Sequence, residues 1–191
     1  TAVERFILQV PWVERVRPAM ERAGIHTWNE LEITRVETDA GVVGWGETIQ
    51  NYTWGRVQAE ERVVGKPPFE TMWDDSLGAG LQMALFDTAG KLAGVPLYKL
   101  LGNKCRDWCA ISFWDHDMKP EEYAVEAKTA VELGYTCMKT KTRPWFDVRE
   151  TMRQISEVTP DHFHIDADWN AFLNTASTAI PVLRELETSF P

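Results

Sequence analysis

Two lysines separated by one residue have the clearest potential for chemistry in this sequence. Lys139 and Lys141 close the segment Gly-Tyr-Thr-Cys-Met-Lys-Thr-Lys, residues 134–141. In a β-strand, period-two alternation puts both side chains on one face, at the C-terminal end of the strand. Two ammonium groups this close disfavour each other's charge, so one of them can serve as a general base near neutral pH. Considered alone, the motif is better explained as a pair of exposed lysines at a strand end, and only its context favours a catalytic role.

Carboxylates follow one predicted strand later. We predict a strand over residues 162–166, with His162, His164 and Asp166 on one face and apolar side chains on the other. Asp166 then ends its strand on the same rim as the lysines, and carboxylate oxygens are ligands that suit Mg²⁺. Asp168 follows two residues later. The alternative for these acids is a helix cap or a loop carboxylate after a strand.

A zinc site is a second interpretation of the same strand. His162 and His164 are spaced as zinc ligands can be, and Asp166 could complete a set on that face. Both histidines lie deeper in the predicted strand than Asp166, and a zinc site leaves the lysine pair without a role. We therefore favour Mg²⁺.

The surrounding sequence predicts two kinds of organisation. The first part alternates apolar and polar residues in strands that pair through a turn, followed by a helix with apolar residues at helical spacing. These elements are expected at residues 5–10, 31–38, 42–47 and 81–93, with a loop-like or partly helical excursion at 11–28.

From about residue 108 the pattern changes to strand–helix–strand. We expect strands at 108–114, 135–141 and 162–166, each followed by a helix, at 120–133, 146–158 and 174–187. Repeated βα units imply a parallel sheet with right-handed crossovers. The predicted fold class is α/β, with an N-terminal α+β capping domain at 1–104 and the first three βα units of a TIM-like barrel at 105–191.

Three motifs, in this order, carry a resemblance to a known family. They are Leu81-Gln-Met-Ala-Leu-Phe-Asp-Thr-Ala-Gly-Lys-Leu-Ala-Gly-Val-Pro, the segment ending Lys139-Thr-Lys141, and His164-Ile-Asp-Ala-Asp168. Together they resemble the mandelate racemase and muconate-lactonizing branch of the enolase superfamily, over its N-terminal half. The hairpin arm Gly-Val-Val-Gly-Trp-Gly-Glu47 also resembles the capping domain of that family.

The resemblance implies a role for each candidate residue. Lys141 corresponds to the acid/base that moves a proton α to a carboxylate, and Lys139 to its partner, which lowers the pKa of its neighbour and helps to bind the substrate carboxylate. Asp166 corresponds to the first Mg²⁺ ligand. Asp168, placed with substrate binding, stands where the family usually has asparagine; a shifted register, Asp168-Trp-Asn170, would make Asp168 the ligand instead. In this family the metal stabilises the enediolate that forms.

The resemblance also limits what these residues can be expected to do alone. A complete barrel has eight βα units and about 250 residues, so the remaining metal carboxylates and the group opposite Lys141 are expected on strands beyond residue 191. We expect the 191 residues alone to be inactive or to bind carboxylates without turnover. For the whole enzyme we prefer an acid-sugar dehydratase, with racemase, epimerase or cycloisomerase activity as alternatives. Two loops at 11–28 and 48–55 are expected to contribute specificity through His26, Trp28, Tyr52 and Trp54, although packing explains these aromatic residues as well.

Composition excludes several other classes of protein. The chain has 191 residues, 44% of them apolar, and a net charge of −9 without a Lys/Arg stripe, so we expect no nucleic-acid partner. We found no apolar run approaching the roughly 18 residues of a membrane span. Three cysteines without CxxC spacing indicate reduced thiols. We expect a cytoplasmic, homo-oligomeric enzyme acting on a small carboxylate.

Overall fold

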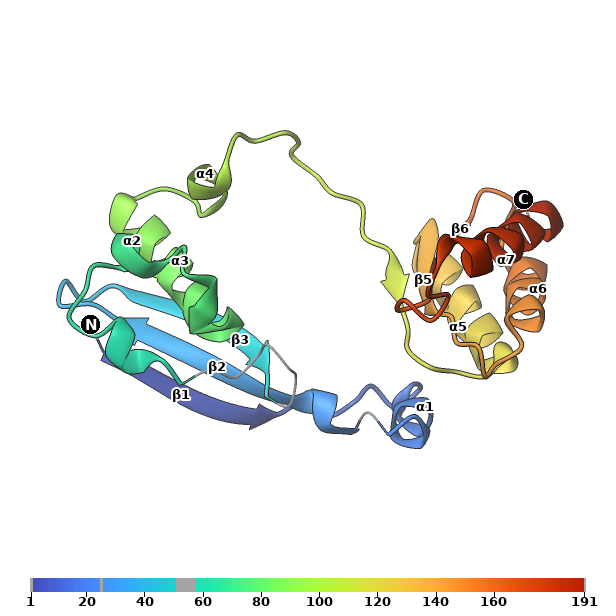
Figure 1. Cartoon of the computed structure of the whole chain (residues 1–191), viewed down its shortest axis with the longest axis horizontal. Helices are drawn as coiled ribbons and strands as arrows, with labels where there is room; N and C mark the ends of the chain where they lie inside the picture. The colour runs from blue at the N-terminus through green and yellow to red at the C-terminus, as the bar shows by residue number, and fades with distance from the viewer. Residues whose placement is uncertain (1, 25, 51–57, 191) are drawn as a thin grey trace. The chain divides into compact units, whose positions relative to one another are not determined.

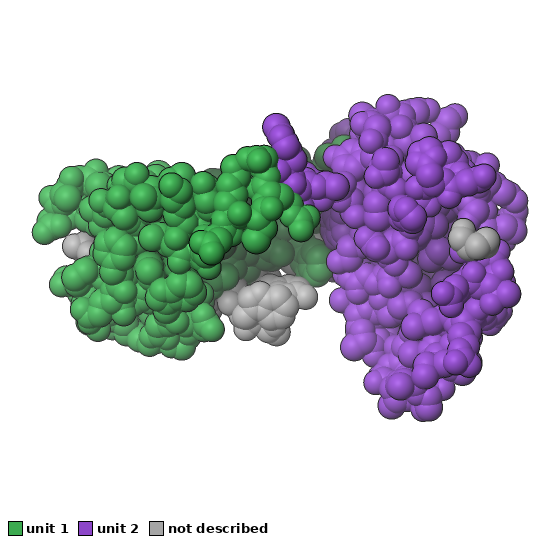
Figure 2. All heavy atoms as spheres, turned by 90° about the horizontal axis from the view of Figure 1, so that it is seen from above, with its two compact units in different colours: residues 1–13, 25–107 green, residues 14–24, 108–191 purple. Residues whose placement is uncertain are grey.

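The computed structural model describes residues 2–24, 26–50 and 58–190. They form two compact units, one from residues 1–13 and 25–107 and the other from residues 14–24 and 108–191 (Figure 2). Each unit has its own hydrophobic core. Among the described residues, none of the helices has the length and apolar character that crossing a membrane requires.

The first unit is an antiparallel sheet covered by a helix (Figure 1). The sheet has the order β1 (Ala2–Gln9), β2 (Glu30–Glu37), β3 (Val43–Ile49). Alternate residues of β2 are buried, as the period-two pattern predicts. The helices of this unit are α2 (Pro68–Thr71), α3 (Ala79–Ala93) and α4 (Tyr98–Leu101), with short 3₁₀ turns at His26–Asn29, Glu60–Arg62 and Asp75–Leu77.

Two glycines let β3 approach α3 closely. A Cβ atom at Gly44 would lie 2.0 Å from the Thr88 hydroxyl, and one at Gly46 would lie 1.9 Å from the carbonyl oxygen of Gly80. No side chain fits in such gaps, so the Gly-Trp-Gly sequence of the hairpin arm is what allows the helix to pack on the sheet. The helix predicted from apolar spacing is confirmed, and it ends at Gly94 in the left-handed conformation.

The second unit is a parallel sheet with the order β4 (Phe113–Trp114), β5 (Cys137–Lys141), β6 (His164–Asp168). Its helices are α5 (Pro120–Glu132), α6 (Val148–Val158) and α7 (Ala176–Ser189). Met138 and Tyr123 lie in its core, and Phe163 and Ile165 pack against that core from the strand face predicted for them. The α/β class is therefore confirmed: an α+β part is followed by three βα units.

The excursion at residues 11–28 contains a helix, α1 (Arg17–Arg22), which is counted with the second unit. Ala19 of this helix belongs to the core of that unit. The described units thus differ from a simple division at residue 104, because residues 14–24 join the later part of the chain. The assignment of 1–104 as a capping domain and 105–191 as a barrel domain stays a prediction.

Two predicted strands have different bounds in the structure. Residues 108–112, all of them described, form no strand: the Trp108 and Ile111 side chains are 90% and 76% exposed. The first strand is limited to the two residues that pair with Met138 and Lys139 of β5. The third strand runs from His164 to Asp168, two residues later than predicted, because its ladder with β5 begins at Cys137 and continues to Lys141.

Candidate functional site

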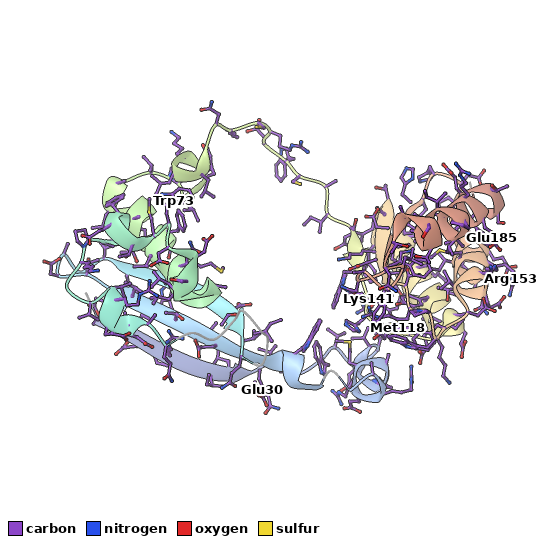
Figure 3. The ribbon with its side chains drawn as sticks, viewed as in Figure 1. Glu30, Trp73, Met118, Lys141, Arg153 and Glu185 are labelled. Carbon is purple, nitrogen blue, oxygen red and sulfur yellow. The ribbon has the colours of Figure 1, made fainter. Side chains whose placement is uncertain are left out.

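The register of β5 and β6 places the lysines beside the acids. Lys139 is opposite Asp166, and Lys141 is opposite Asp168. Since neighbouring residues in register share a face of a sheet, all four side chains lie on the same face. Lys141, labelled in Figure 3, belongs to the second unit and is the last residue of β5, so the pair occupies the C-terminal end of its strand, as predicted.

Asp168 joins the two lysines. Its Oδ2 atom lies 2.7 Å from Lys141 Nζ and 3.0 Å from Lys139 Nζ. The Lys141 side chain is 9% exposed and that of Lys139 is 40% exposed, so one ammonium is held within the protein while the other reaches solvent. The two predicted cations therefore converge on one carboxylate.

The protonation of Asp168 follows from these contacts. The hydrogen bond from Lys141 holds the pKa of this carboxyl well below its ordinary value, with help from the Asn170 backbone N–H and from Lys139, while partial burial opposes the shift. The Asn170 N–H donates to Asp168 Oδ1 at 2.9 Å. Asp168 is thus ionised across the physiological pH range.

Asp166 lies two residues before the end of β6 and has weaker partners. Its Oδ2 atom accepts hydrogen bonds from Ser112 Oγ and Cys137 Sγ, each at 3.3 Å. Burial raises the pKa of the Cys137 thiol, and a hydrogen bond with Ser112 partly offsets this rise. Neither of these two partners carries a positive charge, in contrast to the two ammonium groups that contact Asp168.

A buried tyrosine fixes the end of β5. The Tyr123 hydroxyl donates to the His116 carbonyl oxygen at 2.6 Å and also lies 3.0 Å from the Lys141 carbonyl oxygen. It accepts a hydrogen bond from the Lys141 backbone N–H at 3.1 Å. Burial raises the pKa of Tyr123, so the hydroxyl keeps its proton and can donate. The main chain of Lys141 is thereby anchored.

His116 lies near the same rim and is neutral. Burial lowers its pKa to about 4, an effect that Asp117 opposes and that Arg143 and Lys141 reinforce. Its Nδ1 atom accepts a hydrogen bond from the Asp117 backbone N–H at 2.7 Å.

Two further residues of the rim were not predicted from the sequence. Asn170 Oδ1 accepts hydrogen bonds from Lys141 Nζ at 2.9 Å and from Arg143 Nη1 at 2.8 Å. Arg143 also donates through Nε to Asp117 Oδ1 at 2.6 Å. Continuing the period of two from Lys139 through Lys141 would have indicated Arg143. Asn170 appeared only within the alternative register of the Asp-x-Asn motif.

The donor atoms at this rim fit Mg²⁺ in kind. Asp166 and Asp168 offer carboxylate oxygens on one face of the sheet, as a hard divalent cation requires. Within the described residues, however, no three His, Cys, Asp or Glu side chains come together closely enough to hold a metal ion. The zinc triad of His162, His164 and Asp166 is accordingly not formed, and a complete Mg²⁺ shell needs ligands besides these two acids.

The predicted specificity residues lie largely outside the described part of the chain. Tyr52 and Trp54 fall within residues 51–57, and the side chain of His26 is likewise outside it. Trp28 is half-buried in the 3₁₀ turn His26–Asn29. The roles of these residues stay predictions.

A second charged cluster lies on the other face of the sheet, beneath α5. Asp115 and Glu126 are 3% and 2% exposed, and Arg15 donates to both carboxylate oxygens of Glu126 at 3.0 and 2.9 Å. Burial raises the pKa of Asp115 to about 8, the charge and hydrogen bond of Glu126 add to this, and Arg15 opposes it. Asp115 therefore keeps its proton at neutral pH.

Known proteins resemble the chain both in sequence and in fold. No protein-family model matches it. A D-galactonate dehydratase from Variovorax paradoxus is 30% identical over 126 residues, which cover 55% of this chain and 33% of that protein. The chain thus spans about a third of the length of the curated relatives it matches.

Solved structures match over more of the chain. The 2-chloromuconate cycloisomerase from Rhodococcus opacus 1CP has a TM-score of 0.68 at 19% identity, covering 97% of this chain and 56% of that one. A dipeptide epimerase from Cytophaga hutchinsonii, solved with Mg and the dipeptide D-Ala-L-Val, has a TM-score of 0.62 at 25% identity, covering 83% and 49%. In sequence and fold, the chain is similar to the N-terminal half of enzymes of the mandelate racemase and muconate-lactonizing branch of the enolase superfamily.

Proposed function

We propose that this chain forms part of an enzyme that removes the proton α to the carboxylate of a small acid, with Mg²⁺ as cofactor. The observation that carries the proposal is the convergence of Lys139 and Lys141 on Asp168 at the C-terminal ends of two parallel strands. Catalytic groups lie at this end of the strands in barrels of this kind. The preferred reaction is the dehydration of an acid sugar, which relatives named D-galactonate dehydratase support.

The two lysines have different roles in this proposal. The ammonium of Lys141 is held by two acceptors, Asp168 and Asn170, and a side chain with a fixed position suits an acid/base that must meet one particular proton. Lys139 is more exposed, and its proposed role is to meet the substrate carboxylate with the ammonium that is paired with Asp168 in this structure. In a dehydration the α C–H bond and the β C–O bond both break; in a racemisation the proton returns to the α carbon from the opposite face.

Asp166 is our proposed Mg²⁺ ligand, because its partners are neutral whereas Asp168 is already neutralised by two ammonium groups. The position at the strand end favours Asp168 instead, and the shifted Asp-x-Asn register agrees with that alternative. When bound, Mg²⁺ supplies positive charge that stabilises the negative charge developing on the substrate carboxylate. The proposed role of Asp168 is to orient the lysines towards the substrate.

Racemisation, epimerisation and cycloisomerisation start with the same proton removal, and solved structures with these activities in their names share the fold. Which reaction follows depends on the group that faces Lys141 across the substrate. A protein that binds carboxylates without turnover is the alternative from another class. A homo-oligomeric, cytoplasmic enzyme is also part of the proposal.

The test is proton exchange in deuterated water. The protein expressed from its intact gene is incubated with Mg²⁺ and a panel of aldonic acids and N-acyl amino acids, and loss of the α-proton signal is followed by NMR. Exchange with formation of a 2-keto-3-deoxy acid supports a dehydratase, and exchange with inversion supports a racemase or epimerase. Binding of the acids without any exchange would refute the enzymatic proposal. For the 191 residues alone we expect no turnover, since the described residues provide no group of three metal ligands.

The metal role is tested by two isosteric variants. Asp166→Asn should weaken Mg²⁺ binding, measured by titration calorimetry on the intact protein, while Asp168→Asn should leave it nearly unchanged. The reverse result would assign the ligand to Asp168. Equal Zn²⁺ and Mg²⁺ support of exchange would count against a site that prefers oxygen ligands.

A further inference from the structure

One arginine contacts all three loops that follow the strands of the second unit. Arg143 comes two residues after the end of β5 and is 8% exposed. Its guanidinium reaches Asp117 after β4 and Asn170 after β6. Such a side chain, with donors in a fixed plane, can hold several acceptors in one arrangement at once.

Aromatic rings complete the surroundings of this arginine. The guanidinium carbon lies 5.7 Å from the ring centroid of Trp145, on its own loop, and 5.4 Å from that of Phe172, on the loop after β6. The two rings meet edge to face at 5.1 Å. Cation–π contacts at these distances add to the hydrogen bonds and fix the plane of the guanidinium.

The loop that Arg143 holds has a strained backbone. Asn170 and Ala171 have φ angles of 45° and 65°, in the left-handed region that residues with a Cβ atom seldom adopt. Such conformations persist where the surrounding contacts over-determine them. Around Asn170 those contacts are Arg143 Nη1, the Lys141 ammonium and Asp168 Oδ1.

We propose that Arg143 is a positioning residue for Lys141, acting through the amide oxygen of Asn170. This oxygen has two lone pairs, one for Arg143 and one for Lys141. While Arg143 holds the amide, the ammonium of Lys141 has two fixed acceptors, Asn170 and Asp168. Without Arg143, the Asn170 side chain is free to rotate, and the Lys141 ammonium keeps only the Asp168 carboxylate as a fixed acceptor. The consequence for catalysis rests on the function proposed above; the positioning itself does not.

The test measures the chemical reactivity of individual lysines in the 191-residue chain. Brief acylation followed by mass spectrometry gives a labelling rate for Lys141, with the exposed Lys128 as an internal reference. Two variants keep the net charge: Arg143→Lys removes the planar fork, and Asn170→Gly removes the amide while tolerating the left-handed backbone. In each variant we expect the labelling rate of Lys141 to rise about fivefold, which is the factor that corresponds to the loss of one hydrogen bond. The labelling rate of Lys128 should not change.

The controls separate positioning from general loosening. Arg149→Lys removes an arginine that makes two hydrogen bonds to Glu185 away from the rim, and it should leave the Lys141 rate unchanged. The double variant Arg143→Lys/Asn170→Gly should label no faster than either single variant, since both act on one contact. An unchanged Lys141 rate in both single variants, or fully additive effects, would overturn the proposal.

A second measurement links the positioning to catalysis. In the protein from the intact gene, Arg143→Lys should lower kcat for α-proton exchange with little change in KM, because a displaced base affects the chemical step more than substrate binding. If Lys141 labelling changes but the wild-type protein exchanges no substrate proton, the proposed function fails and the positioning stands. If exchange occurs and the labelling of Lys141 does not respond, the positioning fails and the function stands.

Discussion

Two clusters on opposite faces of the parallel sheet contain basic and acidic side chains in opposite proportions. At the rim, two lysines share one carboxylate, Asp168; beneath α5, two carboxyl groups, Asp115 and Glu126, lie with one arginine, Arg15. The rim cluster is open enough for Lys139 to remain 40% exposed, whereas both acids of the second cluster are almost fully buried. Burial therefore changes the outcome: at the rim all three groups are charged, whereas in the second cluster Asp115 is protonated. The rim cluster is thus accessible to solvent through Lys139, while the two acids of the second cluster are not.

The pKa values of Asp168 and Asp115 are shifted in opposite directions, because the two carboxyl groups differ in burial and in the charge of their neighbours. Asp168 has two cations as partners and little burial, so its pKa falls well below the ordinary value. Asp115 loses water and faces the like charge of Glu126, and these two effects exceed the attraction of Arg15, so its pKa rises to about 8. Burial and the sign of the nearest neighbours thus determine which of the two aspartates is charged at neutral pH.

The largest effect is expected within the lysine pair. Lys141→Met should lower α-proton exchange by about 10²–10⁴-fold, the usual contribution of a general acid or base. Lys139→Met should mainly raise KM, because this more exposed lysine is proposed to bind the carboxylate. Both are measured by NMR with the protein from the intact gene. Normal exchange in the Lys141 variant would remove this residue from the base role.

On the opposite face, Arg15→Met should destabilise the second unit by about 2 kcal/mol, since it leaves the buried Glu126 carboxylate without its charged partner. Hydrogen exchange of the β5 amides, followed by mass spectrometry, reports on this unit specifically. Arg17→Met is the matched control: its ion pair with Glu14 is exposed, and its loss should cost less than about 0.5 kcal/mol. Equal effects of the two variants would contradict the distinction between the clusters.

The raised pKa of Asp115 predicts a pH dependence. Between about pH 4 and pH 8 the folded chain holds a proton on Asp115 that the unfolded chain releases, so stability falls as the pH rises through this window. Asp115→Asn keeps a neutral group at the position and should flatten that slope. Denaturant unfolding at pH 5, 6.5 and 8 measures the difference, and parallel curves for the two proteins would argue against a protonated Asp115.

The smallest effect is expected from the bridging carboxylate. Asp168 has a lowered pKa, so its ion pairs contribute stability above about pH 4, the ordinary value for aspartate, and lose it as the pH falls further. Because the cluster is open to solvent, Asp168→Asn should change stability at pH 7 by less than about 1 kcal/mol. A loss as large as that of Arg15→Met would mean that the rim cluster is as structural as the buried one.

Much of the fold followed from local patterns. The hairpin, the long helix of the first unit and the βα units were predictable because apolar residues recur at periods of 2 and 3.6. The strand expected at residues 108–112 was wrong, since an apolar run forms a strand only where a neighbour supplies its hydrogen bonds. The third strand was placed two residues early for a related reason: its register is set by β5, not by its own sequence.

The lysine pair shows how sequence and tertiary structure divide the information about the site. The sequence by itself determined which residues share a face, because alternation along a strand is a local property: Lys139 and Lys141 are on one face, and Asp166 and Asp168 are on one face whichever register is chosen. Only the tertiary structure decided that Asp168 meets both lysines and that Asn170, which Arg143 also contacts, is the second acceptor of Lys141. These contacts join residues 27 or more positions apart in the chain, and they depend on the register between parallel strands, which no local pattern specifies.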